Sequence, residues 1–473
     1  MIAVRAYKDR KVGVFGLGGS GLATARALMA GGADVVAWDD SDVQRALAMD
    51  AGVDVQDFNA MSLDGMAALV LAPGIPLTHP TPHLVVQRAQ SAGVPVLGDV
   101  ELFQHEVRSL KSDAKIVAIT GTNGKSTTTA LIGHMINANG CRAEVGGNIG
   151  KPVFDLEAPR SDTVYVVEVS SYQIDLAPTL RPDIAVLLNI TPDHIDRHGT
   201  LERYAAVKAR LFEHQIEGDT AVIVIDDELS AEVCTSVSAR RTVELVPVSV
   251  EKSLGRGVCV LDGVLYDSRS GKTERVGDLK ELKRLAGAHN WQNAAAAFAV
   301  GRTLGFAPER IFAAFRSFPG LAHRMEIVAE KAGVLFVNDS KATNAEAAAK
   351  ALGSYDDIFW IAGGVAKAGG IDDLTPWFSH ISHAYLIGEA AGQFGETLKG
   401  HVETSDLQQL DAAVASAVQA AIHAAQEGRH PVVLLSPACA SFDQFKNFEI
   451  RGDAFRDMVG AALDAFSSEG VVA

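Results

Sequence analysis

Residues 115–133, KIVAITGTNGKSTTTALIG, decide the fold of this 473-residue chain. An apolar, β-branched run ending at Thr120 predicts a buried strand, and the segment that begins at Lys125 predicts a helix. The loop between them is typical of a phosphate loop: backbone amides surround phosphate oxygens, Lys125 reaches the terminal phosphates, and the Ser126 hydroxyl can bind Mg²⁺. Ile119 stands where the usual pattern has its first glycine. The strand and helix context still favours ATP, with these candidate ligands: Gly121, Thr122, Asn123, Gly124, Lys125, Ser126 and Thr127.

The alternation of strand and helix continues on both sides of this stretch. Runs such as KVGVF, VYVVEVSS, IAVLLNIT, DIFWIAGG and PVVLLSPA each precede a segment with helical spacing, which predicts α/β domains built on parallel sheets. We predict three: a Rossmann-like domain at 1–110, a P-loop ATPase-like domain at 111–319, and a second Rossmann-like domain at 320–473. The polar, glycine-broken stretch 235–285 predicts hairpins that form a small antiparallel sheet beside the central one.

Composition narrows the classes of function. The net charge of −16 disfavours nucleic-acid binding, because it would repel phosphodiester backbones. The four cysteines lack the spacing of a metal site or a disulfide scaffold, which favours a reducing cytoplasm. No stretch approaches the roughly 20 apolar residues of a membrane span, and the N-terminus does not have the form of a signal peptide.

A second glycine-rich loop lies near the N-terminus. GLGGSG at 16–21 follows an apolar run, and Asp39 ends the next one. This is the dinucleotide fingerprint, in which the helix N-terminus favours a pyrophosphate and the acid accepts from a ribose hydroxyl. The residues alone leave three alternatives open: NAD, another nucleotide diphosphate, or glycines that only permit a tight turn.

The middle of the chain carries further polar residues after apolar runs. Glu168 ends VYVV, where a carboxylate could hold the magnesium of a bound nucleotide. The loop NITPDHIDRHG at 189–199 offers carboxylates and His194 for a metal or substrate role. Lys208, in YAAVKARLF, has the local sequence of a solvated helix lysine.

These motifs together resemble the Mur ligase family over essentially the whole chain. The shared elements are GTNGKST at 121–127, GGNIG at 146–150, EVSSYQ at 168–173, NITPDHIDRH at 189–198, Lys208, AHNWQN at 288–293, HR at 323–324, NDSKATN at 338–344, GGVAKAGG at 363–370 and SPACASFDQFKNFEIRG at 436–452.

The resemblance implies an activity, and it is closest to the members that add D-glutamate. ATP phosphorylates the carboxylate of UDP-N-acetylmuramoyl-L-alanine to an acyl phosphate, and the amine of D-glutamate then forms an amide, in cytoplasmic peptidoglycan-precursor synthesis. The implied protein is a monomer with two Mg²⁺ ions. Lys125, Glu168, His194 and Lys208 would be catalytic.

The resemblance also assigns sites. It implies that the first loop binds UDP rather than NAD, and that Lys208 is carbamylated, which reverses the local interpretation. One Mg²⁺ would be held by Ser126 and Glu168, the other by His194 and Lys208. ATP would also contact Asn293, Arg324 and Asp339. The UDP substrate would contact Ser20, Asp39, Asp40, Gly74, Asn148 and His194, and D-glutamate would contact Lys341, Thr343, Lys367, Ser441, Phe442 and Phe448.

Three rival interpretations remain. A nicotinamide oxidoreductase leaves the loop at 121–127 unexplained. A nucleotide-switched binding protein leaves the C-terminal lysines and SPACASFDQF unexplained. A folate-type or later-acting ligase shares the ATP chemistry but takes another amino acid, so the choice of D-glutamate depends on the C-terminal motifs.

Overall fold

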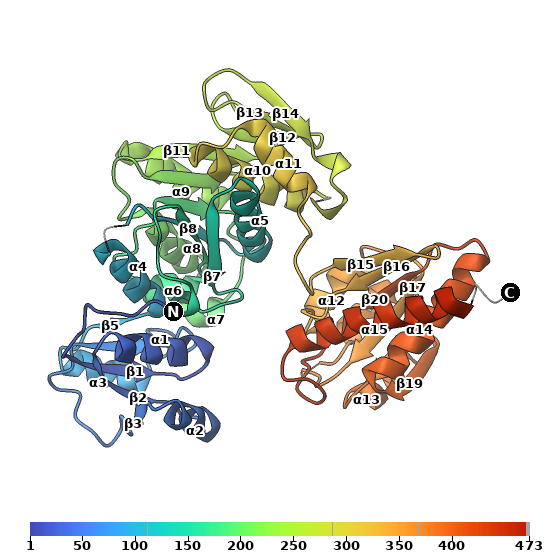
Figure 1. Ribbon diagram of the computed structural model, residues 1–473, viewed down its shortest axis with the longest axis horizontal. Helices are drawn as coiled ribbons and strands as arrows, with labels where there is room; N and C mark the ends of the chain where they lie inside the picture. The colour runs from blue at the N-terminus through green and yellow to red at the C-terminus, as the bar shows by residue number, and fades with distance from the viewer. Residues whose placement is uncertain (111, 286, 368, 470–473) are drawn as a thin grey trace. The chain divides into compact units, whose positions relative to one another are not determined.

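The computed structural model describes residues 1–110, 112–285, 287–367 and 369–469. The chain divides into two compact units, Met1–Pro319 and Gly320–Ala473 (Figure 1). Lys111, the first residue of the predicted central domain, lies outside the described residues, and the three-domain division stays a prediction. None of the helices in the described part of the chain combines the length and apolarity that crossing a bilayer requires.

The first unit begins with a five-stranded parallel sheet of order β3-β2-β1-β4-β5. Its strands are β1 (Lys11–Phe15), β2 (Asp34–Trp38), β3 (Asp54–Val55), β4 (Ala68–Leu71) and β5 (Val96–Leu97). The helices between and after them are α1 (Gly19–Ala30), α2 (Asp42–Asp50), α3 (Leu84–Ser91) and α4 (Asp99–Ser109).

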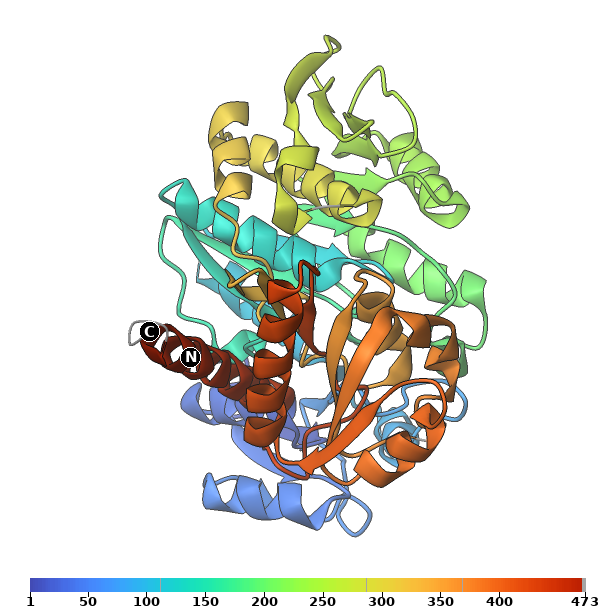
Figure 2. The same cartoon turned by 90° about the vertical axis from the view of Figure 1, so that its right-hand side faces the viewer.

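The same unit contains a nine-stranded sheet of order β14-β13-β12-β11-β10-β9-β6-β8-β7. The parallel strands are β6 (Lys115–Thr120), β7 (Arg142–Gly147), β8 (Thr163–Glu168), β9 (Ile184–Leu187), β10 (Thr220–Val224), β11 (Glu244–Ser249) and β12 (Val258–Leu261). The antiparallel strands β13 (Val264–Asp267) and β14 (Glu274–Asp278) extend it at one end, as both views show (Figures 1 and 2).

The predicted antiparallel side sheet is present but begins later than the sequence suggested. The sequence predicts hairpins for residues 235–249, whereas these residues form the end of α9 (Glu228–Arg240) and the parallel strand β11. Most of α9 faces solvent, so its sequence is polar without being irregular. Only the stretch from β12 to β14 has the hairpin form.

Alternating side chains of the central strands bury the two faces of this sheet. Ile116 and Ala118 face a core that also contains residues of α1 and α4, while Val117 and Ile119 face a core with α5 and α10. Each fully buried valine or isoleucine contributes roughly 1.5–3 kcal/mol. The remaining helices of this unit are α5 (Lys125–Ala138), α6 (Ser171–Asp175), α7 (Ile195–His198), α8 (Leu201–Ala209), α10 (Ala288–Thr303) and α11 (Pro308–Arg316), with short 3₁₀ turns at Val153–Asp155, Arg210–Phe212, Leu279–Glu281 and Lys283–Leu285.

The second unit is a six-stranded sheet of order β15-β16-β20-β17-β18-β19, in which only the edge strand β15 is antiparallel to its neighbour. The strands are β15 (Glu326–Lys331), β16 (Val334–Asn338), β17 (Ile358–Gly363), β18 (Ile381–Ile387), β19 (Thr404–Gln408) and β20 (Val432–Leu435). One face packs on α14 (Leu410–Gln426) and α15 (Phe448–Glu469). The other packs on α12 (Ala345–Leu352), the 3₁₀ segment Asp372–His380 and α13 (Ala391–Leu398). The α/β fold class is confirmed.

Candidate active site at the carboxyl ends of the strands

The loop between β6 and α5 has a backbone that only glycine suits. Gly124 precedes α5 with a φ of 84°, in the left-handed region. A β-carbon there would lie 2.3 Å from the Oδ1 atom of Asn293 on α10. The same Oδ1 accepts a hydrogen bond from Thr128 Oγ1 at 3.1 Å, so Asn293 is fixed beside the loop.

Two lysines converge on this loop. Lys125 Nζ donates to the carbonyls of Gly121 at 2.9 Å and Thr122 at 2.7 Å. Lys208 Nζ donates to the same Gly121 carbonyl at 2.9 Å. The Lys208 side chain lies over the ring of Tyr204 and is only 1% exposed, so the local interpretation of a solvated lysine is wrong. Its position on α8, which packs beneath the loop, explains the burial.

Burial disfavours the charged form of Lys208. Desolvation, with the positive charge of Lys125 as a smaller cause, lowers the pKa of Lys208 to about 7. An amine with this pKa is substantially neutral at neutral pH, and it can therefore act as a nucleophile toward CO₂.

The shifted pKa predicts a pH dependence of stability. The folded-state pKa lies below the unfolded value, so between pH 7 and about 10 the unfolded chain binds one more proton here. This residue therefore makes the free energy of unfolding rise with pH, by about 1.4 kcal/mol per unit. In CO₂-free buffer, Lys208→Met should remove that slope from urea unfolding curves. Equal slopes for the wild type and Lys208→Met would contradict the assignment, and exposed Lys252→Met is the matched control.

Glu168 lies at the end of β8, next to β6. It is 2% exposed, and its Oε1 atom accepts from Asn148 Nδ2 at 2.7 Å. Its Oε2 atom is buried and has no hydrogen-bond partner among the described residues. An orphaned carboxylate oxygen beside a phosphate loop fits a divalent cation.

The donors fit Mg²⁺ bound together with a nucleotide. Within the described residues, no group of three or more His, Cys, Asp or Glu side chains could hold a metal by itself. Ser126 and Glu168 offer two oxygen ligands. Phosphate oxygens of the nucleotide and water molecules would complete the coordination of the ion, which is how Mg²⁺ is commonly bound.

The loop after β9 completes this edge of the sheet. The Oδ1 atom of Asn189 accepts from the Asn123 amide at 2.8 Å, which ties this loop to the phosphate loop. His194 has a left-handed backbone, with a φ of 52°, and its Nδ1 atom lies 3.0 Å from the Tyr172 hydroxyl. His198 instead is buried against Ser171 Oγ at 2.9 Å, and desolvation lowers the pKa of His198 to about 4.

The glycine-rich loop after β1 is shaped by its own backbone. A β-carbon on Gly21 would lie 1.8 Å from the Gly16 carbonyl oxygen, so this turn requires glycine. The Asp39 carboxylate accepts from the amides of Leu17 at 2.5 Å and Ser41 at 2.8 Å. It thus holds the loop, in addition to any contact with a ribose.

The other residues predicted for the UDP substrate surround this loop. Asp40 is exposed and lies 3.5 Å from His83 Nε2. Ser20, at the start of α1, lines a small cavity together with Pro73, and Gly74 is exposed in the loop after β4. Since β4 lies next to β1 in the sheet, the structure brings these residues to one edge.

In the second unit, the predicted residues follow three neighbouring strands. Lys341 and Thr343 follow β16, Lys367 follows β17, and Ser441 follows β20. An isolated bridge between Val365 and Ala440 joins two of these loops.

Lysines and aromatic residues differ in exposure at this edge. The Lys341 Nζ atom lies over the Phe448 ring, 5.6 Å from its centroid. Lys367 and Phe442 are exposed. Because β16, β20 and β17 are adjacent and parallel, two lysines lie on loops at one edge of this sheet.

Asp339 and Arg324 also lie in this unit. The Asp339 carboxylate accepts from Ser436 Oγ at 2.9 Å and from the Met325 amide at 3.2 Å. Burial raises the pKa of Asp339 to about 6, although the Ser436 hydrogen bond opposes the shift. Arg324 is exposed.

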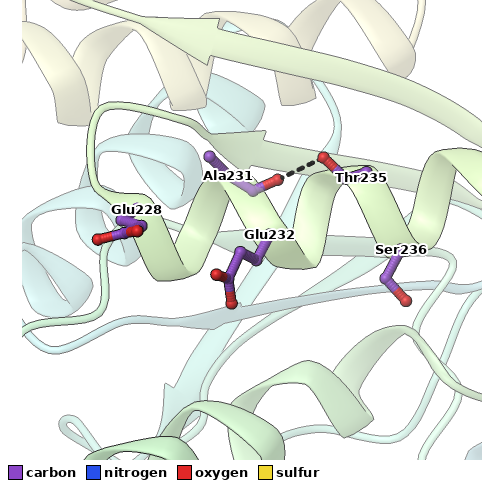
Figure 3. A pocket seen from close by; sticks show the side chains of 5 residues that line it. All are labelled: Glu228, Ala231, Glu232, Thr235 and Ser236. Atoms are coloured by element: carbon purple, nitrogen blue, oxygen red, sulfur yellow. Dashed lines mark hydrogen bonds between the residues drawn. The ribbon is translucent and has the colours of Figure 1, made fainter.

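A surface hollow along α9 does not belong to this site. Figure 3 shows that its lining comes from one helix, with Glu228, Ala231, Glu232, Thr235 and Ser236. Thr235 Oγ1 donates to the Ala231 carbonyl of the same helix. Two carboxylates and no cation among these lining residues would repel a phosphate.

Several site residues escaped the sequence analysis. Tyr204 contacts Lys208, and its position one helical turn earlier could have indicated this. Gln292, whose Oε1 accepts from Asn189 Nδ2 at 3.0 Å, stands beside the predicted Asn293. No local pattern distinguished Tyr172 from an ordinary aromatic residue.

Three family models match the chain in succession. They are described as the N-terminal domain of MurD-like Mur ligases at residues 10–98, the Mur ligase middle domain at 119–301, and the Mur ligase glutamate ligase domain at 323–439.

Curated relatives are similar along nearly their whole length. A protein of Rhizobium meliloti is 52% identical over 469 residues, which cover 99% of both chains. One of Phenylobacterium zucineum is 50% identical over 466 residues, covering 98% of this chain and 99% of the relative. Both are named UDP-N-acetylmuramoylalanine–D-glutamate ligase.

Solved structures share the fold. The UDP-N-acetylmuramate-alanine ligase of Thermotoga maritima matches with a TM-score of 0.55 at 17% identity, covering 96% of this chain and 100% of that one. A UDP-N-acetylmuramoyl-L-alanyl-D-glutamate–2,6-diaminopimelate ligase matches with a TM-score of 0.55 at 19% identity, covering 87% and 94%.

Proposed function

The chain belongs to the Mur ligase family, and from this premise we propose that it joins D-glutamate to UDP-N-acetylmuramoyl-L-alanine at the expense of ATP. The observation that carries the chemistry is that the phosphate loop and Glu168 lie at the carboxyl ends of the adjacent strands β6 and β8, and that buried Lys208, on α8, donates to the same loop. We expect a cytoplasmic monomer, with its four cysteines reduced.

The first half of the reaction activates a carboxylate. An oxygen of the L-alanyl carboxylate attacks the γ-phosphorus of ATP, the bond to the bridging oxygen breaks, and ADP leaves an acyl phosphate. Lys125 neutralises charge on the transferring phosphate, for which it must exchange the carbonyls of Gly121 and Thr122 for phosphate oxygens. Ser126 and Glu168 would hold one Mg²⁺ ion, which would supply further charge neutralisation, and His194 and Lys208 would hold a second ion.

The second half forms the amide. The neutral amine of D-glutamate attacks the acyl carbon, and the tetrahedral intermediate expels phosphate while nitrogen loses a proton. We assign D-glutamate to Lys341, Thr343, Lys367, Ser441, Phe442 and Phe448. Two lysines match the two carboxylates of this amino acid. We assign Asn293, Arg324 and Asp339 to ATP, and Ser20, Asp39, Asp40, Gly74, Asn148 and His194 to the UDP substrate.

The function is tested by Mg²⁺-dependent phosphate release from ATP with UDP-N-acetylmuramoyl-L-alanine. D-glutamate, L-glutamate, L-lysine and meso-diaminopimelate are compared, and the product mass is determined. We expect release and an adduct with D-glutamate alone. Turnover with another amino acid would keep the ligase activity but show that D-glutamate is not its amino-acid substrate. The absence of any ATP-dependent adduct would refute the ligase proposal.

Carbamylation of Lys208 predicts a dependence on CO₂. The neutral amine adds to CO₂ to give a carbamate and a proton, which converts a buried neutral amine into an anion able to hold a metal. CO₂-depleted enzyme should lose about tenfold or more of its activity, and bicarbonate should restore it. Mass spectrometry of the intact protein should show the added CO₂. Full activity in CO₂-free buffer without that mass would contradict carbamylation.

A further inference from the structure

Arg197 connects the metal-site loop to the loop after β4. It lies on α7, three residues after His194, and its guanidinium reaches three backbone carbonyls of residues 73–79. Nη1 donates to the His79 carbonyl at 3.2 Å, while Nη2 donates to the carbonyls of Ile75 and, at 3.4 Å, Pro73. This loop contains Gly74, which we assign to the UDP substrate.

Tyr172 extends the connection to His194. The Arg197 guanidinium lies over the Tyr172 ring, 5.2 Å from its centroid. The Tyr172 hydroxyl lies 3.0 Å from His194 Nδ1, and the two rings are 4.9 Å apart. A continuous set of contacts thus runs from the loop 73–79 through Arg197 and Tyr172 to His194.

The chemistry of these contacts indicates positioning. Within the described residues, the Arg197 side chain has backbone carbonyl oxygens and an aromatic face as partners. A planar guanidinium can donate to several carbonyls at fixed angles, whereas a lysine ammonium is a point charge that cannot span them. The Tyr172 hydroxyl contacts Nδ1 of His194, while Nε2 of the same ring lies 3.4 Å from an Asp193 carboxylate oxygen, so Tyr172 fixes the ring through one of its two nitrogens.

We infer that Arg197 and Tyr172 are positioning residues, which hold the loop 73–79 in register with His194 so that the UDP substrate presents its carboxylate at the phosphate loop. This inference rests on the proposed function. It assigns a role to two residues through their contacts with other residues of the protein.

The first test uses Arg197→Lys, which keeps the charge, with exposed Arg160→Lys as the matched control. Calorimetry without ATP measures binding of UDP-N-acetylmuramoyl-L-alanine. We expect Arg197→Lys to weaken it by about 10- to 100-fold, the range for lost charged hydrogen bonds. The KM for ATP should stay within about twofold of the wild type, and Arg160→Lys should match the wild type throughout.

The second test asks whether the two residues act together. Tyr172→Phe removes only the hydroxyl, and we expect it to lower kcat by about tenfold with little change in substrate affinity. In the double variant Arg197→Lys/Tyr172→Phe, the fold-loss of kcat/KM should be smaller than the product of the two single losses, because both substitutions interrupt the same set of contacts.

The outcomes separate the inference from the proposed function. Wild-type protein that ligates D-glutamate, together with Arg197→Lys that binds the UDP substrate normally, would overturn the inference alone. Independent, multiplicative effects of the two substitutions would also overturn it, as would an equal loss of affinity for ADP, which would indicate general unfolding. A wild-type protein that neither binds nor ligates the UDP substrate would overturn both proposals.

Discussion

Replacing Lys125 with methionine is expected to lower kcat by about 10²–10³-fold, the usual loss when one preorganised donor to a developing charge is removed. In the structure the ammonium group donates to the carbonyls of Gly121 and Thr122, at the mouth of the phosphate loop. In the complex, phosphate oxygens would take their place. Methionine fills a similar volume without the charge, so the loop and its glycines should keep their shape.

Steady-state phosphate release and the thermal unfolding temperature together check this prediction. The unfolding temperature of Lys125→Met should stay near that of the wild type, because the side chain is only half-buried. Lys272→Met, at an exposed position, controls for loss of a positive charge. If Lys125→Met turned over within tenfold of the wild type, another group would have to bind the transferring phosphate.

Glu168→Gln is expected to have a comparable effect through the metal. Gln is nearly isosteric, and its amide can keep a hydrogen bond with Asn148, but a neutral group is a far weaker ligand for Mg²⁺. We expect kcat to fall by about 10²–10³-fold and the Mg²⁺ concentration for half-maximal activity to rise. Removal of the buried, incompletely satisfied carboxylate should leave stability unchanged or raise it.

A magnesium titration of phosphate release, paired with thermal unfolding, distinguishes this from damage to the fold. Glu157→Gln, at an exposed carboxylate that pairs with Arg142, is the matched control. An unaltered Mg²⁺ dependence in Glu168→Gln would remove Glu168 from the metal site. A large drop in unfolding temperature would assign the carboxylate a structural role instead.

The parts of the site that could be predicted from sequence are those fixed by neighbouring residues. The phosphate loop is formed by residues close in sequence. Strand β6, the loop glycines with positive φ, and helix α5 follow one another within a span of 24 residues. The sequence also indicates that Glu168 lies near the phosphate loop, because each follows or ends a predicted strand and the carboxyl ends of parallel strands meet at one edge of a sheet.

Features that depend on tertiary packing were not accessible in this way. Lys208 has a polar helical context, and only the packing of α8 under the loop makes it a buried lysine. Asp39 was expected to face a ribose, whereas its oxygens also accept from two backbone amides. The contacts of Arg197 with residues 73–79 join segments more than a hundred residues apart, and no periodicity marks such a pair.

The close approach of Gly124 to Asn293 has a consequence for synthesis of the chain on the ribosome. The loop emerges long before α10, yet Asn293 packs against it, and the alanines of α10 belong to the same buried core as Val117 and Ile119 of β6. A nascent chain that ends before residue 293 lacks both these alanines and this amide. The growing polypeptide therefore cannot form the nucleotide pocket in its final shape until well over half of the message has been translated, and ATP can act as a folding ligand only after that point.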